Sequence, residues 1–332
     1  MRRNLIEEII SIKDRTEFDA TMVFEGRLDD IQDVLKKLKE SNQKSNKELL
    51  RYIPIATVAC FEAFFQSMIS LLIDSGKPFS SNVAGFNQSK NVKLDFDIVA
   101  AIQSKKLTVG EFVAHLLPYN NLSDIVSNFK TITELDLLSE LKIFVNEPGP
   151  PYLANYWEMF RKDPARVIIG VNNTFTLRHI FCHEFATTVA IDIGEIEENF
   201  YCSSIFMSIV FRYIHKLAFP KFSGDTKQDM EIAIKEFQDA EANLTALATQ
   251  IKERFYDYDW GPEYKINLFD ETVQKWKVYR DSRSNLKCDM FKGTDFYDIH
   301  FNIERTNITL EKISSLAQEF AEILRREPFQ KQ

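Results

Sequence analysis

The side chains best suited to chemistry lie in the segment Phe175–Phe185, where three basic residues interrupt a run of large apolar ones. They are Arg178, His179 and His183. An apolar core gains nothing from such groups unless they are paired or line a cleft, because burying them unsatisfied costs free energy. Histidine titrates near neutral pH and can move protons, and a guanidinium holds phosphate oxygens bidentately. The two types together can cleave a phosphodiester without a metal ion.

The spacing of Arg178 and His183 sets a geometric condition. Residues five apart on a helix are separated by about 7.5 Å along the axis and by roughly 140° around it, so these two do not share one face. A long arginine side chain can still reach across the helix edge, and a two-fold partner can bring a second copy opposite. The spacing by itself is weak, since an arginine four to six residues ahead of a histidine occurs by chance about once per chain.

The sequence around these residues resembles the HEPN motif, in which an arginine is followed by a polar residue, three further residues and a histidine. Here that motif reads Arg178-His179-Ile180-Phe181-Cys182-His183. The earlier segment Ala59–Phe65, apolar except for Glu62, is similar to the helix that precedes the motif in HEPN proteins, and Leu94–Ile125 resembles the linking helices of the ribonuclease branch. The resemblance covers about residues 1–220.

This resemblance implies an all-α, metal-independent endoribonuclease without a cofactor, commonly a homodimer whose two motifs meet at a shared cleft. It implies that Arg178 binds the scissile phosphate, that His183 transfers protons and that His179 is an accessory polar residue. The RNA would be cut by 2′-hydroxyl attack, leaving 2′,3′-cyclic phosphate ends, in a toxin or in phage defence. In members with a nucleotidyltransferase antitoxin, a tyrosine follows the histidine by two positions. Phe185 stands there, so silencing by modification at that position is not implied.

Other interpretations of these residues stay open. His179 and His183 are four apart and share a helical face, but zinc needs further ligands at defined positions. All three ionisable groups could instead be satisfied polar residues at a helix junction. Glu62 must be paired or neutral inside an apolar helix. It could anchor Arg178 or another cation as a supporting group, or accept from a backbone amide or a tyrosine hydroxyl.

Basic residues outside the motif are candidates for contact with the substrate. Arg161, Lys162 and Arg166 are the main ones, and solvated surface charge is the alternative for each. The loop lysines Lys90, Lys105 and Lys106 have the same two interpretations.

Helical periodicity dominates the rest of the chain and predicts an all-α fold, a HEPN-like bundle followed by a smaller one. The domains predicted are 1–220 and 225–332, with Phe219–Gly224 as the boundary. Thr108 with Glu111, Ser123, and Asp163 ahead of Pro164 are predicted helix starts. Predicted helices cover about 18–39, 47–74 (bending or beginning near Pro54), 96–103, 108–117, 133–144, 165–186, 196–217, 229–256, 268–290 and 309–326.

The last third resembles the helical LprI-like lysozyme-inhibitor family over about residues 229–316. The resemblance lies in an AxxxL helix at Ala240–Leu244, the segment Gln274–Arg280 (QxWxxYR here, similar to the family's QxxWxxYR) and Cys288. The second cysteine of secreted relatives is absent here, which fits a reducing compartment. Trp276, Tyr279 and Leu286 are predicted on the inner face of a small bundle, with Arg280 and Asp281 bridging helices.

Composition limits the classes of function. The net charge of −8 argues against broad coating of nucleic acid but allows a small basic pocket on an acidic body. Cys60, Cys182, Cys202 and Cys288 have no CxxC spacing and are expected to be buried free thiols. Between Ile53 and Ile73 only Glu62 is charged, and a core helix is expected there. We expect a cytoplasmic protein without membrane contact or signal peptide. The alternative function is a non-catalytic helical interaction module.

Overall fold

The computed structural model describes residues 5–14, 20–40, 46–86, 96–104, 106–184, 192–222, 226–258, 262–289, 292 and 297–325. Throughout these ranges the regular elements are helices, so the predicted all-α class is confirmed. The chain divides into two compact units, Met1–Pro220 and Lys221–Gln332. The division falls in the segment where the change in composition predicts a boundary.

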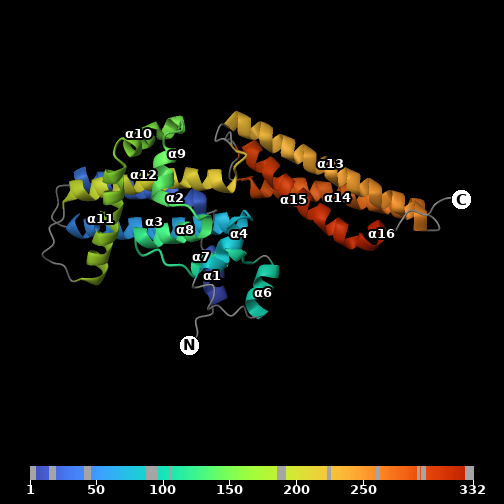
Figure 1. The fold of residues 1–332 in the computed structure, drawn as a ribbon, viewed down its shortest axis with the longest axis horizontal. Coiled ribbons are helices and arrows are strands. Elements are labelled where there is room, and N and C mark those ends of the chain that lie inside the picture. Colours follow the sequence, from blue (N-terminus) through green and yellow to red (C-terminus); the bar gives the residue numbers. More distant parts are fainter. Residues whose placement is uncertain are drawn as a thin grey trace. The chain divides into compact units, whose positions relative to one another are not determined.

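The first unit is built around α3 (Asn46–Asp74), which packs against α2, α7, α11 and α12. Phe61, Phe64 and Met68 of α3 are almost completely buried. Figure 1 shows α2, α3 and α12 running side by side, with α11 crossing them. The helices of this unit are α1 (Leu5–Asp14), α2 (Ala20–Glu40), α3, α4 (Phe79–Asn82), η1 (Val83–Gly85), α6 (Phe96–Gln103), α7 (Val109–His115), α8 (Leu122–Thr133), α9 (Leu137–Phe144), η2 (Pro151–Leu153), α10 (Ala154–Lys162), α11 (Pro164–His183) and α12 (Ile193–Ala218).

One helix in the described part of the chain, Glu48–Asp74, is long and apolar enough to cross a membrane by length and composition. The core helix of a soluble protein passes the same test. Neighbouring helices bury most of the large apolar residues of α3, including Ile53 and Leu72. The helix begins at Asn46 and continues through Pro54, so it does not begin at the proline.

Several helix starts follow the predicted capping chemistry. Thr108 and Glu111 form a reciprocal capping box, and the Asp163 side chain accepts a hydrogen bond from the Arg166 amide at 3.0 Å. The prediction for Ser123 was wrong, because Asn121 is the N-cap and its side chain accepts from the Asp124 amide at 2.8 Å. The predicted helix 133–144 begins later, at Leu137, since Asp136 caps it.

The crossing of α11 and α12 depends on Gly170. A β-carbon at this position would lie 2.5 Å from Cβ and 2.8 Å from Sγ of Cys202 on α12. Such distances are far inside van der Waals contact, so the two helices can approach this closely only because the residue has no side chain. The crossing holds the C-terminal half of α11, which carries the arginine–histidine motif, against α3 and α12.

We therefore expect Gly170→Ala to destabilise the first unit by about 1–3 kcal/mol, the usual cost of overpacking. Gly26 of α2 is a matched control, because a β-carbon added there would meet no atom within 4 Å. Gly26→Ala should be neutral or stabilise the protein by up to about 1 kcal/mol, since alanine is the better helix former. Urea unfolding of both variants measures the difference. Equal effects would contradict this account of the crossing.

The second unit contains α13 (Thr226–Tyr258), α14 (Pro262–Lys287), α15 (Tyr297–Glu319) and the short α16 (Ala321–Arg325). The first three pack together around Leu244, Ile251, Phe269 and Leu316. Helix α15 begins at Tyr297, twelve residues before the predicted start.

Arg280 of α14 is 2% exposed and lies at the centre of a polar network. Its guanidinium pairs with Glu241 of α13 and Asp281, and donates to the Thr309 hydroxyl of α15 at 3.2 Å. Asp281 also pairs with Arg305 of α15 at 2.9 Å. The prediction that Arg280 and Asp281 bridge helices is thus confirmed.

Two predicted inner residues of α14 are on the outside. Tyr279 is 55% exposed and Leu286 is 79% exposed, so the prediction for both was wrong; Trp276 does pack against the small core. All four cysteines are free, as expected. Cys60, Cys202 and Cys288 are buried, whereas Cys182 is exposed, which corrects the prediction for that residue.

Candidate functional site

Arg178 and His183 meet at the C-terminal end of α11. Nη1 of Arg178 lies 3.4 Å from Nε2 of His183, the last residue of the helix. A guanidinium can only donate, so a hydrogen bond in this pair requires Nε2 of His183 to be its acceptor. The arginine reaches across the helix edge, and the two side chains converge within one chain although their backbone positions diverge.

The same guanidinium also faces α3. Nη2 of Arg178 is 3.8 Å from Oε1 of Glu62, and these side chains are 27% and 41% exposed. Of the partners considered for Glu62, the structure therefore shows the arginine. Burial raises the pKa of the Glu62 carboxyl above its ordinary value, and the Arg178 charge offsets part of that effect. The Arg178 guanidinium therefore lies between the Glu62 carboxylate of α3 and the His183 imidazole of its own helix.

His179 and Cys182 complete the exposed end of α11. The rings of His179 and His183 have centroids 5.2 Å apart, as expected for residues four apart on a helix. Both histidines and Cys182 are exposed to solvent. No group of three or more potential metal ligands occurs among the residues that the structure describes.

Arg51 is a basic residue of this region that sequence reasoning missed. Its guanidinium carbon lies 6.0 Å from the centroid of the Phe181 ring, within the motif, and its Nη1 pairs with Glu48 at 2.6 Å. No local signal marks Arg51, because it is more than one hundred residues from the motif and sits at an ordinary position of an apolar helix.

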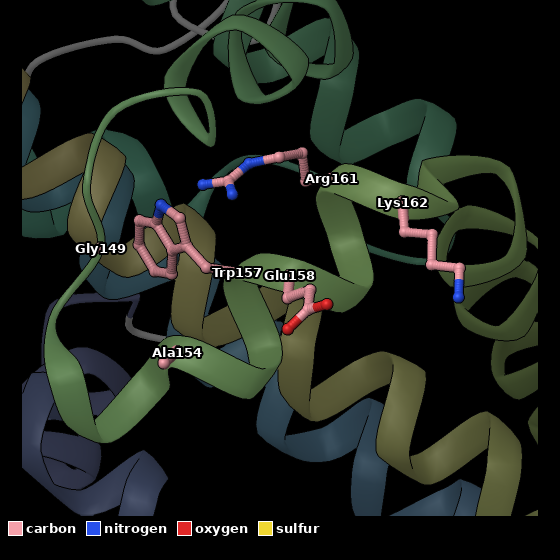
Figure 2. A pocket seen from close by; sticks show the side chains of 6 residues that line it. All are labelled: Gly149, Ala154, Trp157, Glu158, Arg161 and Lys162. Atoms are coloured by element: carbon pink, nitrogen blue, oxygen red, sulfur yellow. The ribbon is translucent and has the colours of Figure 1, made fainter.

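The other predicted substrate-binding residues lie away from the motif. Arg161 and Lys162 line a hollow of about 510 Å³ with Gly149, Trp157 and Glu158. Arg161 donates through Nε and Nη2 to the carbonyl of Val145, at 2.9 and 2.6 Å. Figure 2 shows its guanidinium directed towards the Trp157 side of the hollow, while the Lys162 side chain extends away from it.

Arg166 lies near the start of α11, and its Nε donates to Glu198 of α12 at 2.6 Å. Twelve residues separate it from Arg178, which corresponds to about 18 Å along the helix. One chain therefore does not bring Arg161, Lys162 and Arg166 to the Arg178–His183 pair, and their role in substrate binding stays a prediction. Lys106 is exposed. Lys90, Lys105 and Phe185 lie outside the described residues.

Comparison with known protein families, characterised proteins and solved structures found no match to this chain. The features of this chain with chemical potential are the arginine–histidine contact, its exposure and its link to Glu62.

The raised pKa of Glu62 predicts how stability depends on pH. An unfolded glutamate releases its proton near pH 4.3, roughly the ordinary value, and the folded one at higher pH. The contribution of Glu62 to the free energy of unfolding therefore falls as the pH rises from its unfolded pKa through its higher folded pKa. Glu62→Gln should raise Tm relative to wild type at neutral pH, and the difference should shrink as the pH approaches 4.

Thermal unfolding across this pH range measures the effect. Glu184→Gln is the control, because Glu184 is exposed at the same end of α11. A Tm difference between wild type and Glu62→Gln that grows towards acid pH would show that the sign is wrong.

Proposed function

We propose that this chain is a metal-independent endoribonuclease of the HEPN type. The observation that carries the proposal is the 3.4 Å contact between the Arg178 guanidinium and the His183 imidazole on the exposed end of α11. The family resemblance of the motif and of the Glu62 helix supports it. An arginine and an imidazole on an accessible surface are a suitable pair for binding a phosphodiester and starting its cleavage.

The chemistry assigns a role to each side chain. When Arg178 turns from His183 to the phosphate, Nε2 of His183 is free to accept the proton of the 2′-hydroxyl as O2′ attacks phosphorus, and the bond from phosphorus to O5′ breaks. The leaving O5′ receives a proton from a protonated histidine, either His183 itself or its equivalent in a second subunit. Arg178 stabilises the extra negative charge on the phosphoryl oxygens in the transition state. His179 is the accessory polar group, and Glu62 positions the arginine.

The proposal extends to the assembly and the setting. A homodimer would place two motifs at one cleft and supply both the base and the acid. Arg161, Lys162 and Arg166 would contact RNA away from the cleaved bond. We place the enzyme in the cytoplasm, without membrane contact, as a toxin or a phage-defence nuclease with a possible antitoxin or regulatory partner.

Incubation of the purified protein with total RNA in excess EDTA tests this proposal. We expect discrete cleavage that EDTA does not inhibit, with 2′,3′-cyclic phosphate and 5′-hydroxyl ends, and we expect DNA to stay intact. Loss of cleavage on metal removal, or 3′-hydroxyl ends, would contradict the mechanism. The absence of any cleavage would instead favour the second function, a non-catalytic helical interaction module.

A further inference from the structure

Helix α14 of the second unit has large apolar residues on two opposite sides. Phe269, Val273 and Arg280 form the inner face, which packs against α13 and α15. A second apolar set lies on the opposite side and is exposed. It consists of Tyr264 (74% exposed), Leu268 (51%), Val278 (69%), Tyr279 (55%) and Leu286 (79%).

This outer set lies along one side of the helix in two groups about 15 Å apart, Tyr264 with Leu268 and Val278 with Tyr279 and Leu286. At about 100° per residue, all five side chains fall within a sector of roughly 100°, the width of an apolar face that packs on another helix. Glu271, Lys275 and Ser282 lie in the same sector. We call these eight residues the α14 stripe. Large apolar side chains exposed together along one helix are typical of an interaction surface.

The charges in the stripe point to its partner. Glu271 and Lys275 are the only ionised residues in it, they have opposite signs, and they lie one helical turn apart between Leu268 and Val278. When two copies of the helix pair antiparallel about a point level with Val273, Glu271 of each lies opposite Lys275 of the other. The same register places Leu268 opposite Val278 and Tyr264 opposite Ser282. An isologous two-fold contact requires this kind of self-complementarity.

Glu271 and Lys275 also pair within one chain, with Nζ of the lysine 2.6 Å from Oε1 of the glutamate. Both side chains are more than half exposed in that pair, so each keeps room for a second partner of opposite sign. Two copies in the antiparallel register would therefore join their pairs into a network of four alternating charges.

We propose that a second copy of this chain binds the α14 stripe, forming an antiparallel two-helix contact with reciprocal Glu271–Lys275 pairs. The proposal is independent of the ribonuclease activity and concerns a surface of the second unit. One helix face is small for an interface, so the contact should be weak, with Kd on the order of micromolar. A partner helix without a positive and a negative charge at matching positions would leave Glu271 or Lys275 without an ion pair across the contact.

Sedimentation of the full-length chain over a range of micromolar concentrations provides the first test. Val278→Asp should halve the mass of the assembly, raising Kd about a hundredfold, because it places two carboxylates in an apolar contact. Leu310→Asp is the matched control, since Leu310 is 48% exposed on α15 and outside the stripe. The control variant should assemble like wild type, whose chain mass is 38.7 kDa.

Charge exchange tests the register. Glu271→Lys and Lys275→Glu should each weaken assembly about tenfold, because each places like charges opposite one another twice. An equimolar mixture of the two variants should assemble again, since every cross-chain pair is then opposite in sign. The pairs within each chain remain repulsive, so recovery cannot arise from them. Arg283→Glu, an exposed charge change outside the stripe, should have no effect.

Each outcome of these experiments either supports the proposal or overturns it. Assembly that falls in the single variants and returns in the mixture supports the proposal. A wild-type chain that stays monomeric at every concentration would overturn it and leave the stripe to the first unit or to another protein. Assembly that is unchanged by Val278→Asp, or a mixture that fails to recover, would overturn it as well. Cleavage of RNA is measured separately and decides only the proposed enzyme.

Discussion

Replacing His183 by alanine is expected to lower RNA cleavage about a thousandfold without affecting the fold. The imidazole is exposed at the last position of α11, so its removal leaves no cavity. A side chain that moves the proton in the transition state typically contributes 10²–10⁴-fold, by the usual order of magnitude. Single-turnover cleavage of a defined RNA by equal amounts of folded protein measures the loss.

Arg178→Ala should have a comparable effect, since removing one donor to the developing charge costs about 10²–10³ in rate. Arg178→Lys keeps the charge but loses the planar, bidentate geometry, so it should recover only part of the activity. His179→Ala should reduce cleavage by a smaller factor, on the order of tenfold. Expression of the wild-type chain should slow bacterial growth, and expression of the first two variants should not.

Cys182→Ser is the matched control for this series. Cys182 is exposed and lies next to His183 on the same turn, but it has no role in the proposed reaction. It should cleave like wild type. Cleavage that persists in His183→Ala, with circular dichroism and Tm unchanged, would remove the assignment of the site. A loss in Cys182→Ser equal to that in His183→Ala would indicate a structural effect at the helix end.

The second large effect concerns stability. Arg280→Met is expected to destabilise the second unit by about 1–3 kcal/mol, because the partly buried Glu241 and Asp281 each lose one of their two cations and the buried Thr309 hydroxyl loses its donor. Arg280 is 2% exposed, pairs with Glu241 and Asp281, and lies over the rings of Phe237 and Trp276 at 4.9 and 5.3 Å. Methionine can fill the volume but cannot replace the charge.

The same network predicts sensitivity to acid. Burial alone would raise the pKa of Glu241, but hydrogen bonds from Lys277 and Arg280 bring it below its ordinary value. An acid with a lowered folded pKa stabilises the fold above its unfolded pKa, and the contribution is lost as the pH falls through the folded one. The stability difference between wild type and Arg280→Met should therefore narrow at low pH.

Amide hydrogen exchange in peptides of α13, α14 and α15 measures this loss of stability. Arg283→Met is the control, since Arg283 is exposed on the same helix. It should leave exchange unchanged. Protection that is equal in wild type and Arg280→Met would show that the network does not stabilise the unit.

The fold class followed from the sequence because apolar periodicity survives in most helices. The prediction from apolar periodicity failed for the start of α15, and the reason is physical. The buried positions of the missed stretch, 297–308, include the polar residues Asn302, Glu304 and Thr306 between Ile299 and Ile308. Polar residues at inner positions interrupt the hydrophobic period from which a helix is predicted. The prediction for Tyr279 and Leu286 failed for the opposite reason. Large apolar side chains were expected on the inner face, but these two are on the outer face of α14.

The candidate site was only partly predictable. The motif identified Arg178, His179 and His183, and the isolated charge of Glu62 in an apolar helix indicated a partner. The contact of Arg178 with Glu62 depends on how α11 packs against α3, and its contact with His183 depends on where α11 ends, and no local pattern reveals either. Arg51 was missed for the same reason.

Cleavage of a defined RNA that carries a single 2′-deoxy substitution tests the central claim most directly. If Arg178 and His183 direct attack by the neighbouring 2′-hydroxyl, the wild-type protein in EDTA will cut the all-ribose RNA and leave the substituted bond intact. Cleavage of that bond at an undiminished rate would contradict the mechanism, because the nucleophile would then come from elsewhere.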